Sequence, residues 1–183
     1  MVHPEGRLPS RFHQLGYVVA DLDDAMAWWT QALGVGPFFV TPEFVMPEFL
    51  FRGAPSTPSI RLALSQWGDQ QIELIQQHND APSGYSAFME SAPGGVQHLA
   101  CWSDNIAADL AFYLARGLRI QQEGGSPVND GTRFYYLEGD GHMGAVIELI
   151  DMTPAKHARF ARIAEVAATW DGSYPVRPLA ELG

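Results

Sequence analysis

The sequence contains an internal repeat, and this repeat constrains the fold more than any other feature. The stretch that begins at residue 14 recurs 84 residues later (98 − 14) without a gap. Gln14 then falls on His98 and Gly16 falls on Ala100, and the apolar positions of the following helical segments stay in step. Such self-similarity indicates that the chain is a duplication of one structural unit.

A second pair of matching segments lies further along the chain. The run Ile-Glu-Leu-Ile occurs around Glu73 and again around Glu148, 75 residues later (148 − 73). Both runs have the apolar and β-branched composition that is typical of strands. The two units therefore resemble each other at their ends as well as at their beginnings.

Hydrophobic periodicity and turn residues predict the elements of each unit. Asp21 is a good helix N-cap, Gly34 is expected to end that helix, and Gly68 with Asp69 marks a hairpin turn. The expected strands are 12–20, 36–40, 60–66, 70–76, 96–103, 118–122, 132–138 and 145–150, and the expected helices are 22–33, 106–116 and 154–169. This order predicts an α+β fold of two tandem βαβββ units with an added C-terminal helix.

The same pattern divides the chain into segments. We expect an N-terminal arm at 1–11, the first unit at 12–77, a linker at 78–95 with a short helix near 87–90, the second unit at 96–151, and a C-terminal helix and tail at 152–183. The Pro-rich segment 41–58 is interpreted as an insertion or lid within the first unit. The tail from residue 171 is expected to pack loosely or on a partner.

Composition excludes several classes of function. A net charge of −10 and a pI near 4.8 argue against nucleic acid or an anionic membrane as a partner. No stretch approaches the roughly 18 apolar residues of a membrane span, and the polar N-terminus does not resemble a signal peptide. The single cysteine, Cys101, cannot form an internal disulfide and favours a cytoplasmic location, with a buried side chain as its expected role.

Four polar residues recur at equivalent positions of the two units. Side chains alternate along a strand, so Gln14 and His98 share a face with the small residue that lies two positions further on. Glu73 and Glu148 each interrupt an apolar run, where a carboxylate is costly unless it is paired or binds a cation. One shared cation would relieve both costs. Taken singly, an acidic strand residue is more often solvated, and a strand histidine is more often a hydrogen-bonded core residue.

The first strand offers two neighbouring candidates for this site, His13 and Gln14. The ungapped offset pairs Gln14 with His98, so we expect Gln14 to face the cavity and His13 to face away from it. His3, His78 and His157 have no counterpart in the repeat and are expected at the surface, whereas His142 could support the site or contact substrate. The aromatic residues that could form pocket walls, or belong to the core instead, are Trp67, Trp102, Phe134 and Tyr136.

The doubled unit and its four polar residues resemble the vicinal oxygen chelate superfamily, which includes glyoxalase I, methylmalonyl-CoA epimerase, extradiol dioxygenases and bleomycin-resistance proteins. The resemblance covers about 12–151 and rests on the segments around His98 and Glu148. It implies a curved mixed sheet around a metal-binding cavity. It also implies one divalent ion (Zn, Ni, Co, Mn or Mg), with the metal ligands Gln14, Glu73, His98 and Glu148. The segment 41–58 and the helix after Pro154 depart from the shared core.

Within this resemblance, the chain is expected to be a glyoxalase-like lyase, isomerase or epimerase that acts on a small oxygenated substrate. The metal would polarise a carbonyl while a carboxylate moves a proton, with Glu148 as the first candidate base and Glu73 as the second. The scarcity of Lys and Arg, 11 in all, argues against a polyanionic CoA ester, unless Arg52, Arg61 or Arg133 forms a local pocket.

Two other functions stay open on the sequence. A binding protein of the bleomycin-resistance type would sequester a ligand without chemistry, although such members usually lack the metal-site residues. An extradiol dioxygenase would need Fe(II) with two histidines and one carboxylate, which the chain supplies only if His13 points inward. The resemblance also implies a homodimer, with the site formed either within one chain or across two.

Overall fold

The computed structural model describes residues 11–126, 130–140 and 146–182. Residues 1–10 of the expected arm at 1–11, which include His3, and His142 lie outside the described residues. The first unit comprises β1 (Gln14–Val18), α1 (Leu22–Leu33), β2 (Phe38–Val40), β6 (Ser59–Trp67) and β7 (Gln70–Gln77). The second unit comprises β8 (Gly95–Ser103), α3 (Ile106–Leu114), β9 (Arg119–Gly125), β10 (Arg133–Glu138) and β11 (Val146–Asp151).

The remaining elements connect or extend the two units. They are β3 (Phe44–Val45), β4 (Leu50–Phe51), β5 (Ala54–Pro55), α2 (Gly84–Ser91), α4 (Pro154–Ala168), β12 (Val176–Pro178) and the 3-10 helix η1 (Leu179–Leu182). The described strands form one sheet in the order β12-β2-β6-β7-β1-β8-β11-β10-β9-β4-β5, with β3 paired to β6.

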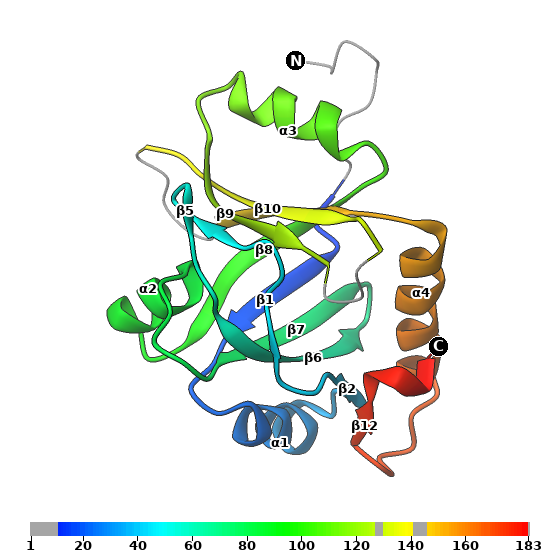
Figure 1. Cartoon of the computed structure of the whole chain (residues 1–183). Coiled ribbons are helices and arrows are strands. Elements are labelled where there is room, and N and C mark those ends of the chain that lie inside the picture. The colour runs from blue at the N-terminus through cyan, green and yellow to red at the C-terminus, as the bar shows by residue number, and fades with distance from the viewer. Residues whose placement is uncertain (1–10, 127–129, 141–145, 183) are drawn as a thin grey trace.

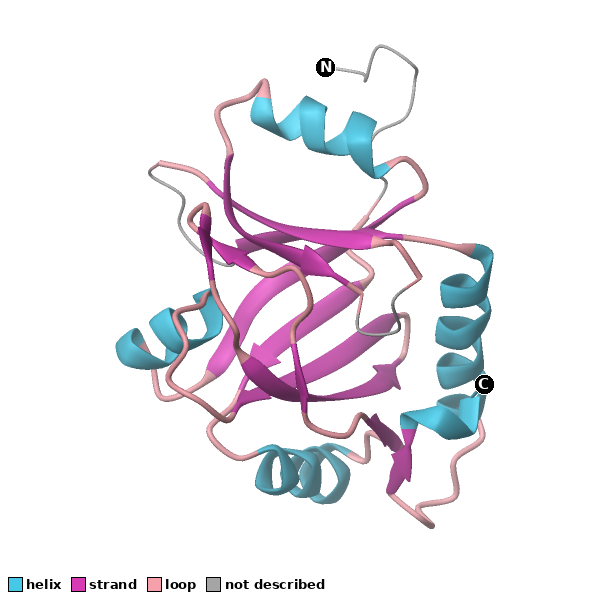
Figure 2. Cartoon of the chain, in the orientation of Figure 1, coloured by secondary structure: helices cyan, strands magenta, loops and turns pink. Residues whose placement is uncertain are grey.

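The two units have the same strand order on either side of the central strands β1 and β8. These two strands pair antiparallel, β7 lies parallel to β1, and β11 lies parallel to β8. Outward from the centre, the order on both sides is therefore the first, fourth, third and second strand of the unit. Figure 1 shows α1 and α3 on opposite sides of the curved sheet, and Figure 2 shows the helices around the periphery of the strands. The predicted α+β fold with a curved mixed sheet is confirmed.

Local signals in the sequence account for the helix ends. The Asp21 side chain accepts a hydrogen bond from the Asp24 amide, and Asn105 does the same for Ala108. Gly34 ends α1 in the left-handed conformation, at φ 66°, which glycine adopts without steric cost. Repeated caps therefore start the equivalent helices of both units.

Alternation along β7 and β11 separates an outer from an inner face of the sheet. In β7, Ile72 and Leu74 pack against α1, while Glu73 and Ile75 point into the concave face. In β11, Leu149 packs with the partly buried residues of α3, and its neighbour Glu148 points inward. The outer face thus forms the core beneath the helices, and the inner face is left to line a cavity.

Two peripheral segments differ from the sequence expectations. The tail does not pack loosely, because β12 pairs in parallel with β2 and extends the sheet. The insertion at 41–58 holds three short strands, of which β3 pairs with β6 of the first unit and β4 with β9 of the second. Among the described residues, none of the helices combines the length and hydropathy that a membrane span requires.

Candidate metal centre

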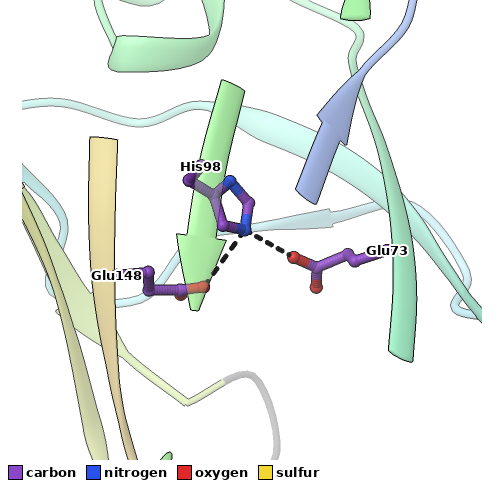
Figure 3. A group of neighbouring side chains, drawn as sticks. All are labelled: Glu73, His98 and Glu148. Carbon is purple, nitrogen blue, oxygen red and sulfur yellow. Dashed lines mark ion pairs between the residues drawn. The ribbon is translucent and has the colours of Figure 1, made fainter. Parts of the chain in front are cut away.

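Three side chains from three strands of one chain meet on the inner face of the sheet. The Nε2 atom of His98 lies 3.2 Å from a carboxylate oxygen of Glu73 and 3.2 Å from one of Glu148. Figure 3 shows the imidazole between the two carboxylates. Because β7, β8 and β11 belong to the same chain, these three groups need no second copy to come together.

The strand register explains this convergence. Gly16 of β1 is the partner of Glu73 in β7 and of His98 in β8. Ala100 of β8 is correspondingly the partner of Glu148 in β11 and of Gln14 in β1. Each inward polar residue therefore has a small residue beside it, as the repeat predicts. The absence of a side chain is essential at Gly16, since a Cβ atom there would collide with the His98 ring.

Gln14 lines the same cavity and is almost completely buried. Its Nε2 group donates a hydrogen bond to Oε1 of Gln71 at 2.8 Å. Its own Oε1 atom has no hydrogen-bond partner within the described part of the chain. A buried carbonyl oxygen without a donor is costly, so this atom is suited to a cation.

His13 lies elsewhere. Its ring stacks on Trp102, with ring centroids 4.5 Å apart and an interplanar angle of 8°. It does not line the cavity, and Gln14 does, which is the register that the ungapped repeat predicts. His78 and His157 are exposed, as expected, and His157 pairs with Asp104 at 3.0 Å.

A β-bulge brings a further residue into the site. The β1–β8 register shifts between Gly16 and Tyr17, so that β8 skips one residue, Gln97. Gln97 and His98 are both buried, and Gln97 Oε1 lies 2.8 Å from His98 Nδ1. If the neutral ring carries its proton on Nδ1, this N–H donates a hydrogen bond to Gln97 Oε1. The lone pair of Nε2 then faces the carboxylates.

The sequence expectations missed both supporting glutamines. Strict alternation puts Gln97 on the face opposite His98, so no local signal indicated its position. Gln71 was accessible to the same reasoning, because it lies two residues before Glu73 and therefore shares its face.

Charge and burial together set the protonation of the site. Burial lowers the pKa of His98, but the two carboxylates, Glu148 above all, outweigh burial and raise it to about 9. Burial raises the pKa of Glu148, and Glu73 adds to this effect while His98 opposes it. Without a metal, the imidazole therefore holds a proton between two carboxylates.

Two tyrosines border the cluster. The Tyr136 hydroxyl lies 3.5 Å from His98 Nε2 and 3.3 Å from the Tyr85 hydroxyl. Both side chains are buried, and burial raises the pKa of each hydroxyl, so both stay neutral. The Tyr85 hydroxyl donates to that of Tyr136, and the Tyr136 hydroxyl can in turn donate to a bound molecule without adding charge. Cys101 is also buried, and burial raises the pKa of its thiol to about 11, which suits a core side chain and not a nucleophile.

The cluster lies at the wall of a cavity of about 140 Å³. Of the aromatic residues proposed as walls, Phe134 and Tyr136 line it. Trp67 is about half exposed and packs on Trp29, and Trp102 packs on His13. Further wall residues come from outside the shared core, namely Phe44 and Met46 from the insertion, Lys156, Arg159 and Phe160 from α4, and Leu179 from η1.

These groups fit a divalent ion. The His98 nitrogen and one oxygen from each glutamate all lie within 4.8 Å of one another. Adjacent ligands of an ion with bonds of about 2.1 Å are roughly 3 Å apart, close to the observed His–Glu separations. One imidazole, two carboxylates and an amide oxygen suit Zn, Mn, Co, Ni or Mg. Among the described residues, one histidine faces this cluster, whereas the iron-dependent dioxygenase pattern requires two.

Comparison with known proteins agrees with this geometry. The family model described as Glyoxalase/Bleomycin resistance protein/Dioxygenase superfamily matches residues 13–136. No curated protein matches the sequence.

Solved structures share the fold at low sequence identity. Methylmalonyl-CoA epimerase from Mycobacterium tuberculosis is 21% identical, with a TM-score of 0.53, over 85% of this chain and 99% of that one. A hypothetical protein from Bacillus halodurans is 15% identical, with a TM-score of 0.54, over 78% and 94%. A mutant of 4-hydroxymandelate synthase from Streptomyces coelicolor is 17% identical, with a TM-score of 0.57, over 79% and 39%. At these identities the likeness establishes the fold.

Proposed function

Because the chain belongs to the glyoxalase/bleomycin resistance protein/dioxygenase superfamily, we propose that it is a metal-dependent isomerase, epimerase or lyase acting on a small oxygenated substrate. The observation that carries this proposal is the cluster of Glu73, His98 and Glu148 on a cavity wall, together with the unpartnered Gln14 Oε1 atom. A binding pocket without chemistry has no need for two neighbouring carboxylates, one partly buried and one buried, which are costly to desolvate.

In this proposal the four side chains hold one divalent ion, with Gln97 and Gln71 fixing the orientation of His98 and Gln14. The bound ion supplies a Lewis acid that polarises a substrate carbonyl. Glu148 is the first candidate to accept the proton from the adjacent carbon, because it is buried, lines the cavity and lies beside His98. Glu73 is the second candidate for this role.

The surrounding residues support the same chemistry. The neutral hydroxyl of Tyr136 lies beside His98 and can donate a hydrogen bond to oxygen that gains negative charge. Apolar walls such as Ile75 and Phe134 keep water from the reacting carbon. The small cavity favours a compact substrate over a large thioester.

Proton exchange tests the proposal without knowledge of the natural substrate. The protein would be analysed for bound metal as purified, reloaded with Zn²⁺, Mn²⁺, Ni²⁺, Co²⁺ or Mg²⁺, and incubated in D₂O with small 2-hydroxy ketones and 2-oxo acids. We expect metal-dependent deuterium uptake at the carbon beside the carbonyl, lost in Glu148→Gln. Absence of both metal binding and exchange would instead support a small-molecule binding protein.

The dioxygenase alternative makes a different demand. It requires Fe(II) and oxygen consumption, and its second histidine would have to be His13, which stacks on Trp102 in this structure. Oxygen uptake with Fe²⁺-loaded protein and a catechol, abolished in His13→Ala, would favour it. The homodimer and the cytoplasmic location stay predictions, and the three clustered groups do not depend on a second subunit.

A further inference from the structure

The C-terminal helix brings a cationic group to the cavity. Lys156, in the first turn of α4, lines the same cavity as Glu73 and Glu148, although α4 lies outside both βαβββ units. The chain carries 11 Lys and Arg residues, and three of them, Arg133, Lys156 and Arg159, border this cavity. In a protein with a net charge of −10, this local concentration of positive charge requires an explanation.

The contacts of Lys156 leave it able to bind a ligand. Its Nζ atom donates to the Thr132 hydroxyl and to the backbone carbonyl of Asp151, the latter at 3.0 Å. Both acceptors are uncharged, and an ammonium group has three donors. Asp130 and Glu148 act on the ammonium from a distance, and within the described part of the chain no carboxylate forms an ion pair with it. One N–H donor thus remains for a molecule in the cavity.

Arg133 differs in this respect. It lies 2.8 Å from Glu48 and 3.3 Å from Glu123, so two carboxylates on the cavity's outer side already engage its guanidinium group. Lys156 is therefore the better candidate for an anion. Partial burial also lowers its pKa, which shows that it is removed from bulk water, where an ionic hydrogen bond contributes more.

The rest of the cavity defines the other features of the ligand. Its walls are mostly apolar, with Ile60, Leu62 and Phe160 among them. Its volume is about 140 Å³. A ligand that fits is compact, carries an anion at one end, and has an apolar body.

We propose that Lys156 binds the carboxylate of a small organic acid whose carbonyl or hydroxyl oxygen faces the Glu73–His98–Glu148 cluster. The placement of the ligand oxygen at the cluster rests on the proposed function. The binding of the carboxylate depends on Lys156 alone. A singly charged carboxylate suits the site better than a phosphate dianion, because Glu148 and Asp130 lie near the ammonium and would repel the second charge.

Matched ligands test the anion site directly. Isobutyrate and its neutral analogue isobutyramide have nearly the same shape, so their difference in affinity reports the carboxylate. The full-length protein would be titrated with each by NMR, both as loaded with Zn²⁺ and after chelator treatment. We expect isobutyrate to bind about tenfold more tightly than isobutyramide in both states, in line with a charge-assisted hydrogen bond.

Variants then assign the effect. Lys156→Met keeps the aliphatic stem and removes the charge, and it should abolish the preference for isobutyrate. Thr132→Val removes one anchor of Lys156 but keeps the ammonium, and it should retain the preference. If Lys156→Met proves unstable, Lys156→Gln keeps a donor for the Asp151 carbonyl and should also lose the preference.

The outcomes separate this inference from the proposed function. An undiminished preference in Lys156→Met, or equal binding of both probes to the unmodified protein, would overturn the anion site. Zn²⁺ affinity measured on the same variant should match that of the unmodified protein. Failure of Zn²⁺ binding with an intact Lys156-dependent preference would refute the metal-dependent function and leave the anion site standing.

Discussion

Gly16 lies directly across the β1–β8 ladder from His98, and the imidazole ring occupies the space that a side chain at position 16 would need. Gly16, which the repeat aligns with Ala100, thus lies where even a methyl group would collide with the His98 ring. Gly16 pairs with both Glu73 and His98, and its lack of a side chain leaves the space in which the His98 ring approaches the carboxylates.

Gly16→Ala should displace His98 and impair metal binding. Overpacking of a buried site typically costs about 1–3 kcal/mol of the free energy of unfolding, and the displaced ring would no longer face both carboxylates. Urea denaturation and metal titration by calorimetry measure the two effects. Gly139→Ala is a matched control, since within the described part of the chain a Cβ atom there meets only Leu118, at 3.9 Å. Equal metal affinity in both variants would show that His98 can move away from position 16 and still bind the metal.

Gln14→Ala should weaken metal binding, while His13→Ala should leave it nearly intact. Gln14 lines the cavity and its amide oxygen has no hydrogen-bond partner among the described residues, whereas the His13 ring packs on Trp102. Loss of the amide should lower affinity by at least the roughly 10–100-fold that removal of a supporting group costs. Zn²⁺ or Ni²⁺ titration of the two variants decides between them. Selective loss of metal from His13→Ala would reverse the assignment and revive the dioxygenase alternative.

Gln97 offers a test of a residue that only the structure identified. Gln97→Ala removes the oxygen 2.8 Å from His98 Nδ1, so the ring loses the contact that fixes its tautomer and orientation. Metal affinity should fall by about 10–100-fold, as for other groups that support a ligand. Gln66→Ala, on the exposed end of β6, should have no effect. The role proposed for Gln97 fails if the two substitutions behave alike.

Chelator treatment should lower the melting temperature. A ligand bound only by the folded state stabilises it by about 2.7 kcal/mol at a concentration a hundred times its Kd. We expect EDTA to lower the midpoint of thermal unfolding of the metal-loaded protein and added metal to restore it. Glu148→Gln should respond much less, because it removes one carboxylate of the cluster. An EDTA response of full size in Glu148→Gln would place the metal elsewhere.

Metal binding should release a proton from His98. Burial lowers the pKa of this imidazole, but Glu148 and Glu73 raise it to about 9, above its ordinary 6.5. The proton therefore stabilises the metal-free fold fully below pH 6.5, and this contribution disappears as the pH rises through 9. Calorimetry at pH 7 in buffers of different ionisation enthalpy should detect about one proton released per metal bound. Heats that do not vary with the buffer would mean that His98 is already neutral.

Much of the fold and of the candidate site follows from local signals in the sequence. Asp21 and Gly34 bound a helix because a side-chain cap and a left-handed glycine act within a few residues. The pairing of Gln14 with His98 follows from alternation and from the repeat, since a slip of one residue would turn the apolar side chains of β1 into the cavity. In the structure Gln14 lines the cavity and His13 does not, as this reasoning predicts.

Other features depend on contacts between distant segments, which local patterns do not encode. The bulge at Gln97 arises where β1 and β8 fail to stay in step, so alternation along β8 alone assigns that residue to the wrong face. The tail forms a strand because the edge of β2 offers unpaired backbone groups. Val176 pairs there with Phe38, which lies far from it in the sequence. Lys156 reaches the cavity because α4 packs across the inner side of the sheet. Apart from the bulge at Gln97, sequence alone thus determined which side chains share a face, whereas the tertiary structure decided which faces meet, because packing joins residues that the chain keeps far apart.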